Sequence, residues 1–275
     1  MRFNCFGTHC GVWGAGAADA RGQLEAWHVQ FSRFRDDSEL SRLNADPRRE
    51  VPVSATMARL LDAVVIANLA TGGLVDGTLA HEIEAAGYRG DLGAPLPLGD
   101  ALVLAPPRRP AGPGRTWKVK LRGGVVQRAP GLAFDSGGLA KGLFADLIAE
   151  RMRGSFAVDC GGDLRFGGSP RRIEVTDPFG GKPLHVFDVR DGAVATSGIG
   201  RRSWLDARGR PAHHLLDPAT GRPAFTGVVQ ATALAPTALE AEWRAKAALL
   251  SADAEWLAHG GLLVHDDGTT TTRRH

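Results

Sequence analysis

The sequence predicts a mixed α+β fold in which largely antiparallel sheets are flanked by helices. The first observation is a series of strand patterns, "SFAVD", "DLRFG", "RIEVTD" and "HVFDVR", which follow one another between residues 155 and 190. The second is a group of amphipathic helical patterns on both sides of that series. Strands that follow strands favour hairpins over a regular β-α-β alternation, because antiparallel neighbours need only short turns.

The helical patterns lie at residues 17–34, 55–71, 135–152 and 237–251. In 17–34, apolar residues that include Leu24, Trp27 and Phe34 recur at helical spacing. In "RDDSELSRLNA", Asp36 and Glu39 have the spacing of a capping box, which predicts a helix start there. A short helix is expected near 255–258.

The remaining strands are predicted from alternation and turn residues. "WKVKL" and "VVQR" alternate around Gly123 and Gly124 and predict a hairpin. The Asp191-Gly192 pair predicts a second hairpin, which joins "HVFDVR" to "AVATSG". "VVQATALA" and residues 262–265 are expected to complete the sheets. We expect residues 1–275 to form a single domain with a surface loop at about 89–115, which holds six of the 16 prolines.

Composition excludes several classes of function. The net charge is +3, and the 33 basic residues are interspersed with 30 acidic ones. The sequence therefore has no basic stripe of the kind that would predict nucleic-acid binding. Three cysteines without C-x-x-C spacing do not predict a disulfide framework or a zinc site. No apolar run reaches the roughly 18 residues of a membrane span, and the first residues lack the apolar segment of a signal peptide. We therefore expect a cytoplasmic protein with no membrane span.

"DSGGLAKG" (135–142) is the first segment that could carry chemistry. It precedes a helical pattern, and the free N–H groups of a helix start attract anions, to which Lys141 would add a positive charge. The spacing is not that of a P-loop, which needs four residues between its glycines. Asp135 would repel a bare phosphate, so a further group would have to share the site. A simple turn, with Asp135 as a cap and Lys141 in solvent, is the structural alternative.

Three other segments are candidates with equally simple alternatives. "CGGDLRFGG" (160–168) is typical of a tight hairpin, or of a backbone that approaches a ligand closely. His213 and His214 precede a turn, and only one of two adjacent strand residues can face a given pocket, where a histidine could act as a general base. Glu242 and Lys246 lie one helical turn apart, which is also the spacing of an ordinary surface ion pair.

Taken together and in order, eight short motifs resemble the ApbE family, the FAD:protein FMN transferases. They are "FGTHCGVW", "FSRFRDDSELSRLNA", "GGLVDGTL", "DSGGLAKG", "VDCGGDLRFGG", "VATSG", "HHLLDPATGRPA" and "APTALEAE", and the resemblance runs from about Phe3 to Ser251. It implies a T-fold-like architecture, FAD as substrate and Mg²⁺ as cofactor. It also implies transfer of the FMN moiety to a Thr or Ser hydroxyl of an acceptor protein through a phosphoester bond, with release of AMP.

The resemblance also implies roles for individual positions. His214 matches the histidine proposed to deprotonate the acceptor hydroxyl, and Lys141 the lysine that faces FAD. The positions implied in cofactor binding are Phe6, Phe34, Leu74, Val75, Asp76, Asp135, Lys141 and Leu216, and those implied at the metal are Gly138, Glu242, Ala245 and Lys246.

The match departs from the family pattern at four of these positions. Phe6 replaces a methionine, and Phe34 replaces a tyrosine that stacks on the flavin. Glu242 and Lys246 stand where the family has a metal-binding aspartate and threonine, and a charged lysine cannot ligate a metal. Either Lys246 turns away or pairs with Glu242 and leaves a weaker metal site, or its ammonium takes the place of the metal. Hydrolysis of FAD to AMP and FMN, and FAD binding without catalysis, are the alternative functions.

Overall fold

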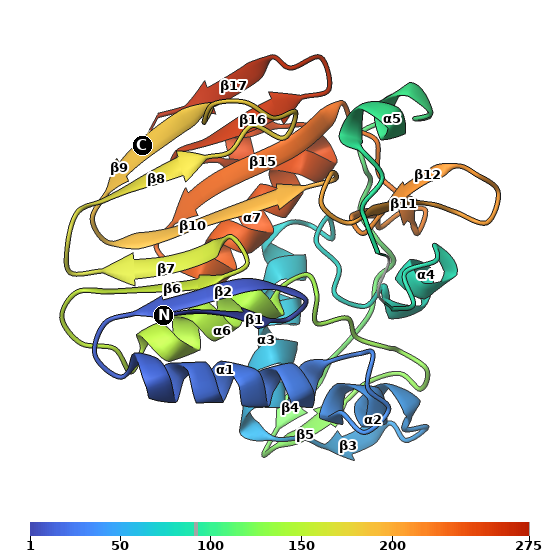
Figure 1. The fold of residues 1–275 in the computed structure, drawn as a ribbon. Coiled ribbons are helices and arrows are strands. Elements are labelled where there is room, and N and C mark those ends of the chain that lie inside the picture. The colour runs from blue at the N-terminus through green and yellow to red at the C-terminus, as the bar shows by residue number, and fades with distance from the viewer. Residues whose placement is uncertain (91–92, 275) are drawn as a thin grey trace.

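A central antiparallel sheet organises the computed structural model, which describes residues 1–90 and 93–274. Within these residues its eight strands lie in the order β1-β2-β6-β7-β10-β15-β16-β17, and all neighbours are antiparallel (Figure 1). The strands are β1 (Arg2–Cys5), β2 (Thr8–Trp13), β6 (Phe156–Cys160), β7 (Asp163–Gly167), β10 (Gly192–Gly198), β15 (Val228–Ala235), β16 (Gly261–His265) and β17 (Thr270–Arg273). The predicted α+β fold with a largely antiparallel sheet is confirmed.

Helices cover one face of this sheet. Helix α6 (Ala140–Ala149) packs against β6 and β7, and α7 (Ala238–Ser251) packs against β10 and β15. Side chains of α7 that include Ala241, Ala245 and Ala248 are fully buried, and their small size lets the helix lie close to the strands. Helices α1 (Ala17–Phe31) and α3 (Ala55–Ala70) add to the apolar core around α6.

A hairpin of β8 (Arg171–Val175) and β9 (His185–Val189) lies across the sheet from α7 (Figure 1). Phe187 on β9 belongs to the same buried cluster as Phe166 and Val194 on the central strands. The sheet is therefore apolar on both faces.

Smaller elements complete the fold. They are α2 (Glu39–Ala45), β3 (Glu50–Pro52), α4 (Ala80–Ala85), α5 (Leu98–Val103), β4 (Lys120–Arg122), β5 (Val125–Gln127), β11 (Ser203–Leu205), β12 (Pro211–His213), β13 (Leu216–Asp217), β14 (Arg222–Pro223) and the 3₁₀ helix η1 (Ala254–Trp256). Strands β3, β5 and β4 form a small sheet, and β11–β12 and β13–β14 are two-stranded pairs. The predicted hairpin around Gly123 and Gly124 is confirmed as β4–β5. The predicted hairpin at Asp191-Gly192 is wrong, because β9 pairs with β8, whereas β10 lies between β7 and β15.

The helix predictions are confirmed in position but not in every boundary. Helix α1 ends at Phe31, because Ser32 has an extended backbone, so Phe34 lies beyond the helix. The prediction of a capping box formed by Asp36 and Glu39 was wrong. Ser38 caps α2, and the Glu39 carboxylate instead accepts hydrogen bonds from the backbone N–H and hydroxyl of Ser54, at 2.7 and 2.8 Å.

Part of the loop predicted at 89–115, residues 91–92, lies outside the described residues. The rest includes α5, which the sequence analysis missed, and otherwise runs over the smaller elements. Backbone hydrogen bonds join Ala111 N–H to the Leu250 carbonyl at 2.8 Å and Gly114 N–H to the Gly73 carbonyl at 3.0 Å. In the described part of the chain, no helix has the length and apolar character needed to cross a membrane.

Candidate active site

A cavity of about 570 Å³ opens where the segment after α1, the segment before α4, the start of α6 and the loops around β11–β13 meet. This volume is within the range of about 300–1,000 Å³ usual for small-molecule sites. The predicted positions that line it are Phe6, Phe34, Leu74, Val75, Asp76, Asp135, Gly138, Lys141, His214, Leu216 and Lys246. Segments that are up to 240 residues apart along the chain therefore share one cavity.

Two predicted positions, Glu242 and Ala245, are absent from the cavity lining. Glu242 is fully buried directly behind Lys141 and Lys246. Ala245 is also fully buried, and its methyl group belongs to the apolar cluster between α7 and the sheet. Only the backbone of Ala245 could contribute to a ligand site.

Helices α6 and α7 cap each other, and this fixes the floor of the cavity. The Asp146 carboxylate of α6 accepts hydrogen bonds from the first two N–H groups of α7, those of Ala238 and Leu239, at 2.8 and 2.9 Å. In return, Glu242 Oε2 of α7 accepts a hydrogen bond from Gly142 N–H in the first turn of α6 at 2.9 Å. A carboxylate is favoured at a helix N-terminus by the free N–H groups and the helix dipole.

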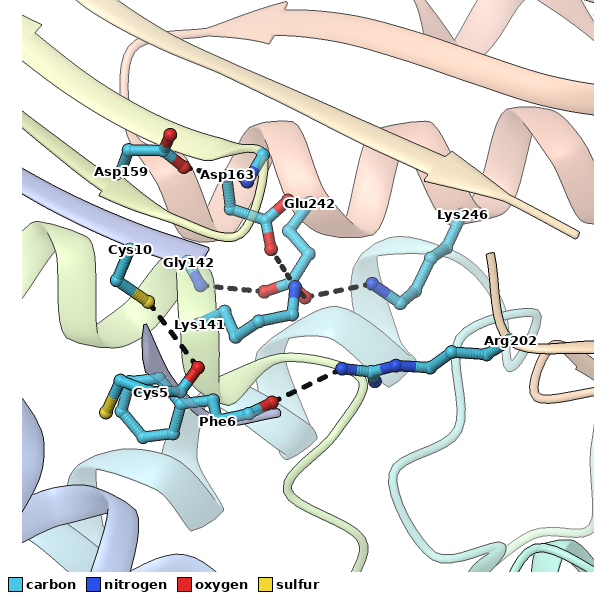
Figure 2. Close-up of polar contacts among 11 residues, drawn as sticks. Cys5, Phe6, Cys10, Lys141, Gly142, Asp159, Asp163, Arg202, Glu242 and Lys246 are labelled. Atoms are coloured by element: carbon cyan, nitrogen blue, oxygen red, sulfur yellow. Dashed lines mark hydrogen bonds and ion pairs between the residues drawn. The ribbon is translucent and has the colours of Figure 1, made fainter. Parts of the chain in front are cut away.

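A cluster of four charged side chains, Lys141, Asp163, Glu242 and Lys246, lies beside this cap (Figure 2). Lys141 Nζ donates a hydrogen bond to Asp163 Oδ2 and lies 3.2 Å from Glu242 Oε1. Lys246 Nζ approaches the same Oε1 atom at 3.0 Å. Two ammonium groups thus share one carboxylate oxygen, and the cluster carries no net charge when all four groups are ionised.

Burial and mutual attraction together set the ionisation of this cluster. Burial lowers the pKa of Lys141, but the Asp163 and Glu242 carboxylates outweigh it and raise that pKa above its ordinary value. Burial raises the pKa of Glu242, and the Lys141 and Lys246 ammoniums overcome this and hold it below its ordinary value. For Asp163, burial and the nearby Glu242 charge win over Lys141, so the pKa is raised. Lys141 therefore remains cationic at neutral pH.

The residues present do not fit a divalent metal. No group of three His, Cys, Asp or Glu side chains suited to a metal is found in residues 1–90 and 93–274, so any metal here would depend on the Glu242 carboxylate. Both oxygens of Glu242 already accept hydrogen bonds, and two cations lie on Oε1. Of the two alternatives for Lys246, the structure has the pairing with Glu242, and Lys246 also lines the cavity.

Arg33 organises the opposite side of the cavity. Its guanidinium lies 3.4 Å from Asp135 Oδ1 and donates a hydrogen bond to the Tyr88 carbonyl at 2.8 Å. It also lies over the rings of Phe34 and Tyr88, at 4.3 and 4.6 Å from their centroids. Phe34, Tyr88 and Trp204 form a continuous aromatic row, since Tyr88 also stacks on Trp204. Phe34 and Tyr88 line the cavity and offer aromatic surface to a planar ring ligand.

Asp76 is held in place by hydrogen bonds from Thr78 in its own loop and from the distant Trp117. Its Oδ1 accepts hydrogen bonds from the Thr78 hydroxyl at 2.7 Å and from the Trp117 indole at 3.0 Å. Its Oδ2 is buried without a hydrogen-bond partner. A buried, unpaired carboxylate oxygen is costly, so this atom is suited to accept a hydrogen bond from a ligand.

The two adjacent histidines point in different directions, as the strand geometry predicts. His213 packs on Phe225 with ring centroids 4.8 Å apart, and burial lowers its pKa to about 4. His214 lines the cavity, and its Nδ1 is buried without a partner. Burial, with the charges of Arg202 and Lys246, holds the pKa of His214 well below its ordinary value, so its ring is neutral and able to accept a proton.

Several cavity residues were missed by the sequence analysis. Arg33, Tyr88, Arg201 and Arg202 all line the cavity. The only signals were an arginine between two aromatics in "FSRFR" and the arginine pair in "GRRSW", both of which are common on protein surfaces. Asp163 lies in the predicted tight turn, where Gly161 and Gly162 have φ values of 70° and 96°, and its pairing with Lys141 had no local signal.

Comparison with known proteins relates the chain to one family. The family model described as "ApbE family" matches residues 6–261. A FAD:protein FMN transferase from Treponema pallidum is 32% identical over 247 residues, which are 80% of this chain and 66% of that protein. A FAD:protein FMN transferase from Klebsiella pneumoniae is 27% identical and matches 82% of this chain and 68% of its own length. The chain thus spans about two thirds of the length of these relatives.

Solved structures agree with the sequence comparison. The ApbE protein from Thermotoga maritima superimposes with a TM-score of 0.79 and 26% identity, over 99% of this chain and 96% of that one. The flavin transferase ApbE from Vibrio cholerae has the same fold, with a TM-score of 0.75, 21% identity and coverage of 99% and 95%. By its sequence motifs, its fold and its matched residues, the chain belongs to the ApbE family.

Proposed function

We propose that the chain binds FAD in this cavity and transfers the FMN moiety to a Thr or Ser hydroxyl of an acceptor protein. The observation that supports it most is the presence of Asp135, Lys141 and His214 in the lining of one cavity, in a chain whose relatives are FAD:protein FMN transferases. The roles of these residues follow from their chemistry and stay predictions.

In the proposed reaction, the acceptor oxygen forms a bond to the phosphorus of the FMN moiety. The bond from that phosphorus to the bridging oxygen breaks, and AMP leaves with the bonding electrons. The hydroxyl proton passes to His214, which is neutral for the reason given above. The cations that line the cavity, Lys141, Lys246 and Arg202, would stabilise the charge that develops on the phosphate oxygens.

The aromatic row and the Asp76 carboxylate would hold the flavin and adenine rings. Phe34 and Tyr88 offer flat apolar faces, and the unpaired Asp76 Oδ2 offers an acceptor for a ring N–H group. Phe34 lacks the hydroxyl of the tyrosine usual at its position, so its contribution is by stacking alone.

The direct test uses FAD and an acceptor domain that a related FAD:protein FMN transferase modifies. We expect a covalent, fluorescent flavin on the acceptor and one AMP for each flavin transferred. An acceptor whose threonine is changed to alanine should remain unmodified. AMP release at the same rate without any acceptor would instead identify a FAD pyrophosphatase, and FAD binding without AMP release would identify a binding protein.

The pH dependence of the reaction tests the state of His214. A histidine base is active when neutral, so a lowered pKa keeps it active at lower pH. We expect kcat/KM for FAD, which reports the free enzyme, to change less than about twofold between pH 7.5 and 6.0. A histidine of ordinary pKa, near 6.5, would lose about three quarters of its neutral form at pH 6.0. A decline of that size, with the fold intact by circular dichroism, would contradict the prediction.

The cytoplasmic location expected from the sequence stays a prediction.

A further inference from the structure

Lys246 occupies the position between two residues that the family resemblance assigns to a metal. Its Nζ lies 3.0 Å from Glu242 Oε1. On the other side, a Cβ built on Gly138 would lie 3.7 Å from Lys246 Cε, so the lysine side chain runs past Gly138 to reach Glu242. Figure 2 shows Lys246 and Lys141 converging on Glu242 from opposite sides. The space between Gly138 and Glu242 is therefore filled by an alkylammonium group.

The charges around this space disfavour a dication. A metal bound to Glu242 Oε1 would lie within a few ångströms of two ammonium groups, each of which is attracted to the same oxygen. Like charges at such short distances repel, and a dication is repelled twice as strongly as a monocation. Glu242 cannot turn away to make room, because its Oε2 caps α6 through Gly142.

The same charges suit a diphosphate. Each lysine ammonium has three N–H donors. Lys246 uses one of them on Glu242, and Lys141 uses two of them, on Asp163 and Glu242. The remaining donors belong to side chains that line the cavity, as do the guanidinium groups of Arg201 and Arg202. When all four side chains of the cluster are ionised, it carries no net charge, and these two arginines then match the two negative charges of a diphosphate.

We propose that this chain binds the diphosphate of FAD through fixed cations, with the Lys246 ammonium in the place of Mg²⁺, and that FAD binding is independent of divalent metal. This inference rests on the proposed function for the choice of FAD as ligand. It does not require an acceptor or a chemical step, so binding alone can test it.

The experiment measures the FAD dissociation constant by flavin fluorescence in the presence of EDTA and in the presence of excess Mg²⁺. The intact chain should give values within about twofold of each other. A loss of affinity of tenfold or more with EDTA would overturn the inference. If FAD binds in neither condition, the proposed function and the inference both fail. If FAD binds without metal but no FMN transfer follows, only the proposed function fails.

A pair of variants makes the test specific to Lys246. In Lys246→Thr combined with Glu242→Asp, the family's metal-binding pair is restored, so we expect FAD affinity to fall at least tenfold in EDTA and to recover with Mg²⁺. Lys182→Thr removes an exposed lysine in the β8–β9 turn and should behave as the unchanged chain does. Circular dichroism would verify that each variant is folded. Metal-independent FAD binding of the double variant equal to that of the unchanged chain would also contradict the inference.

Discussion

Replacement of His214 by asparagine should lower kcat for FMN transfer by about 10²–10⁴-fold, which is the usual contribution of a general base. The histidine lines the cavity, and burial with the nearby Arg202 and Lys246 charges keeps it neutral. Asparagine retains a polar side chain of similar reach but has no basic nitrogen. The measurement is single-turnover formation of covalent flavin on the acceptor, with FAD bound at saturation.

Binding of FAD provides the internal comparison for this variant. Because His214 is neutral and does not neutralise the diphosphate, the FAD dissociation constant should change by less than about threefold. His259→Ala is the matched control. His259 lies beyond α7, its side chain is 42% exposed, and among the charged side chains of the described residues it contacts Glu240 alone. If kcat of His214→Asn decreases by less than tenfold, another group accepts the proton.

Replacement of Gly142 by alanine should destabilise the fold by about 3 kcal/mol or more, from overpacking together with the loss of a helix cap. An added Cβ would lie 2.6 Å from the Ala238 carbonyl oxygen and 2.8 Å from Glu242 Oε2. The first is backbone at the start of α7, and the second is the atom that caps α6. The backbone oxygen cannot shift without separating the two helices, and displacement of Glu242 Oε2 would break the cap. Urea unfolding of the purified chain would measure the change.

Gly22 supplies the matched control for this substitution. It is an exposed glycine inside α1, and a Cβ built there has no atom within 4 Å. Gly22→Ala should therefore stabilise the protein by about 0.5–1 kcal/mol, because alanine is the better helix former. If Gly142→Ala were to unfold at the same urea concentration as the unchanged chain, the reciprocal capping of α6 and α7 would not be the rigid contact described above.

Local sequence patterns predicted the elements well where their own residues decided the conformation. The apolar spacing of α3 and α7 and the glycine pair between β4 and β5 act over a few residues. The capping box at Glu39 failed because a distant partner competed for the same carboxylate. Ser54, 15 residues further on, offers both a backbone N–H and a hydroxyl, and Glu39 binds those instead.

In the candidate site, too, local motifs were predictable from the sequence and contacts between distant residues were not. The order of its motifs predicted the cavity positions, including Asp135, Lys141 and His214, through the family resemblance. The ionic partners of Lys141 were not predictable, because Asp163 is 22 residues away and Glu242 is 101 residues away. Arg33 and Tyr88, 55 residues apart, likewise meet only in the folded chain.

By itself, the sequence determined the fold class, the family and the residue types available for chemistry, since helix and strand periods and short motifs are local properties. Tertiary structure alone decided that Glu242 caps α6 and that Lys141 joins Lys246 on the same Glu242 oxygen. The physical reason is that both outcomes depend on the approach of α6 to α7. Buried charges are paired, and buried polar groups are hydrogen-bonded, with whatever groups lie next to them in the folded protein, regardless of their separation along the chain.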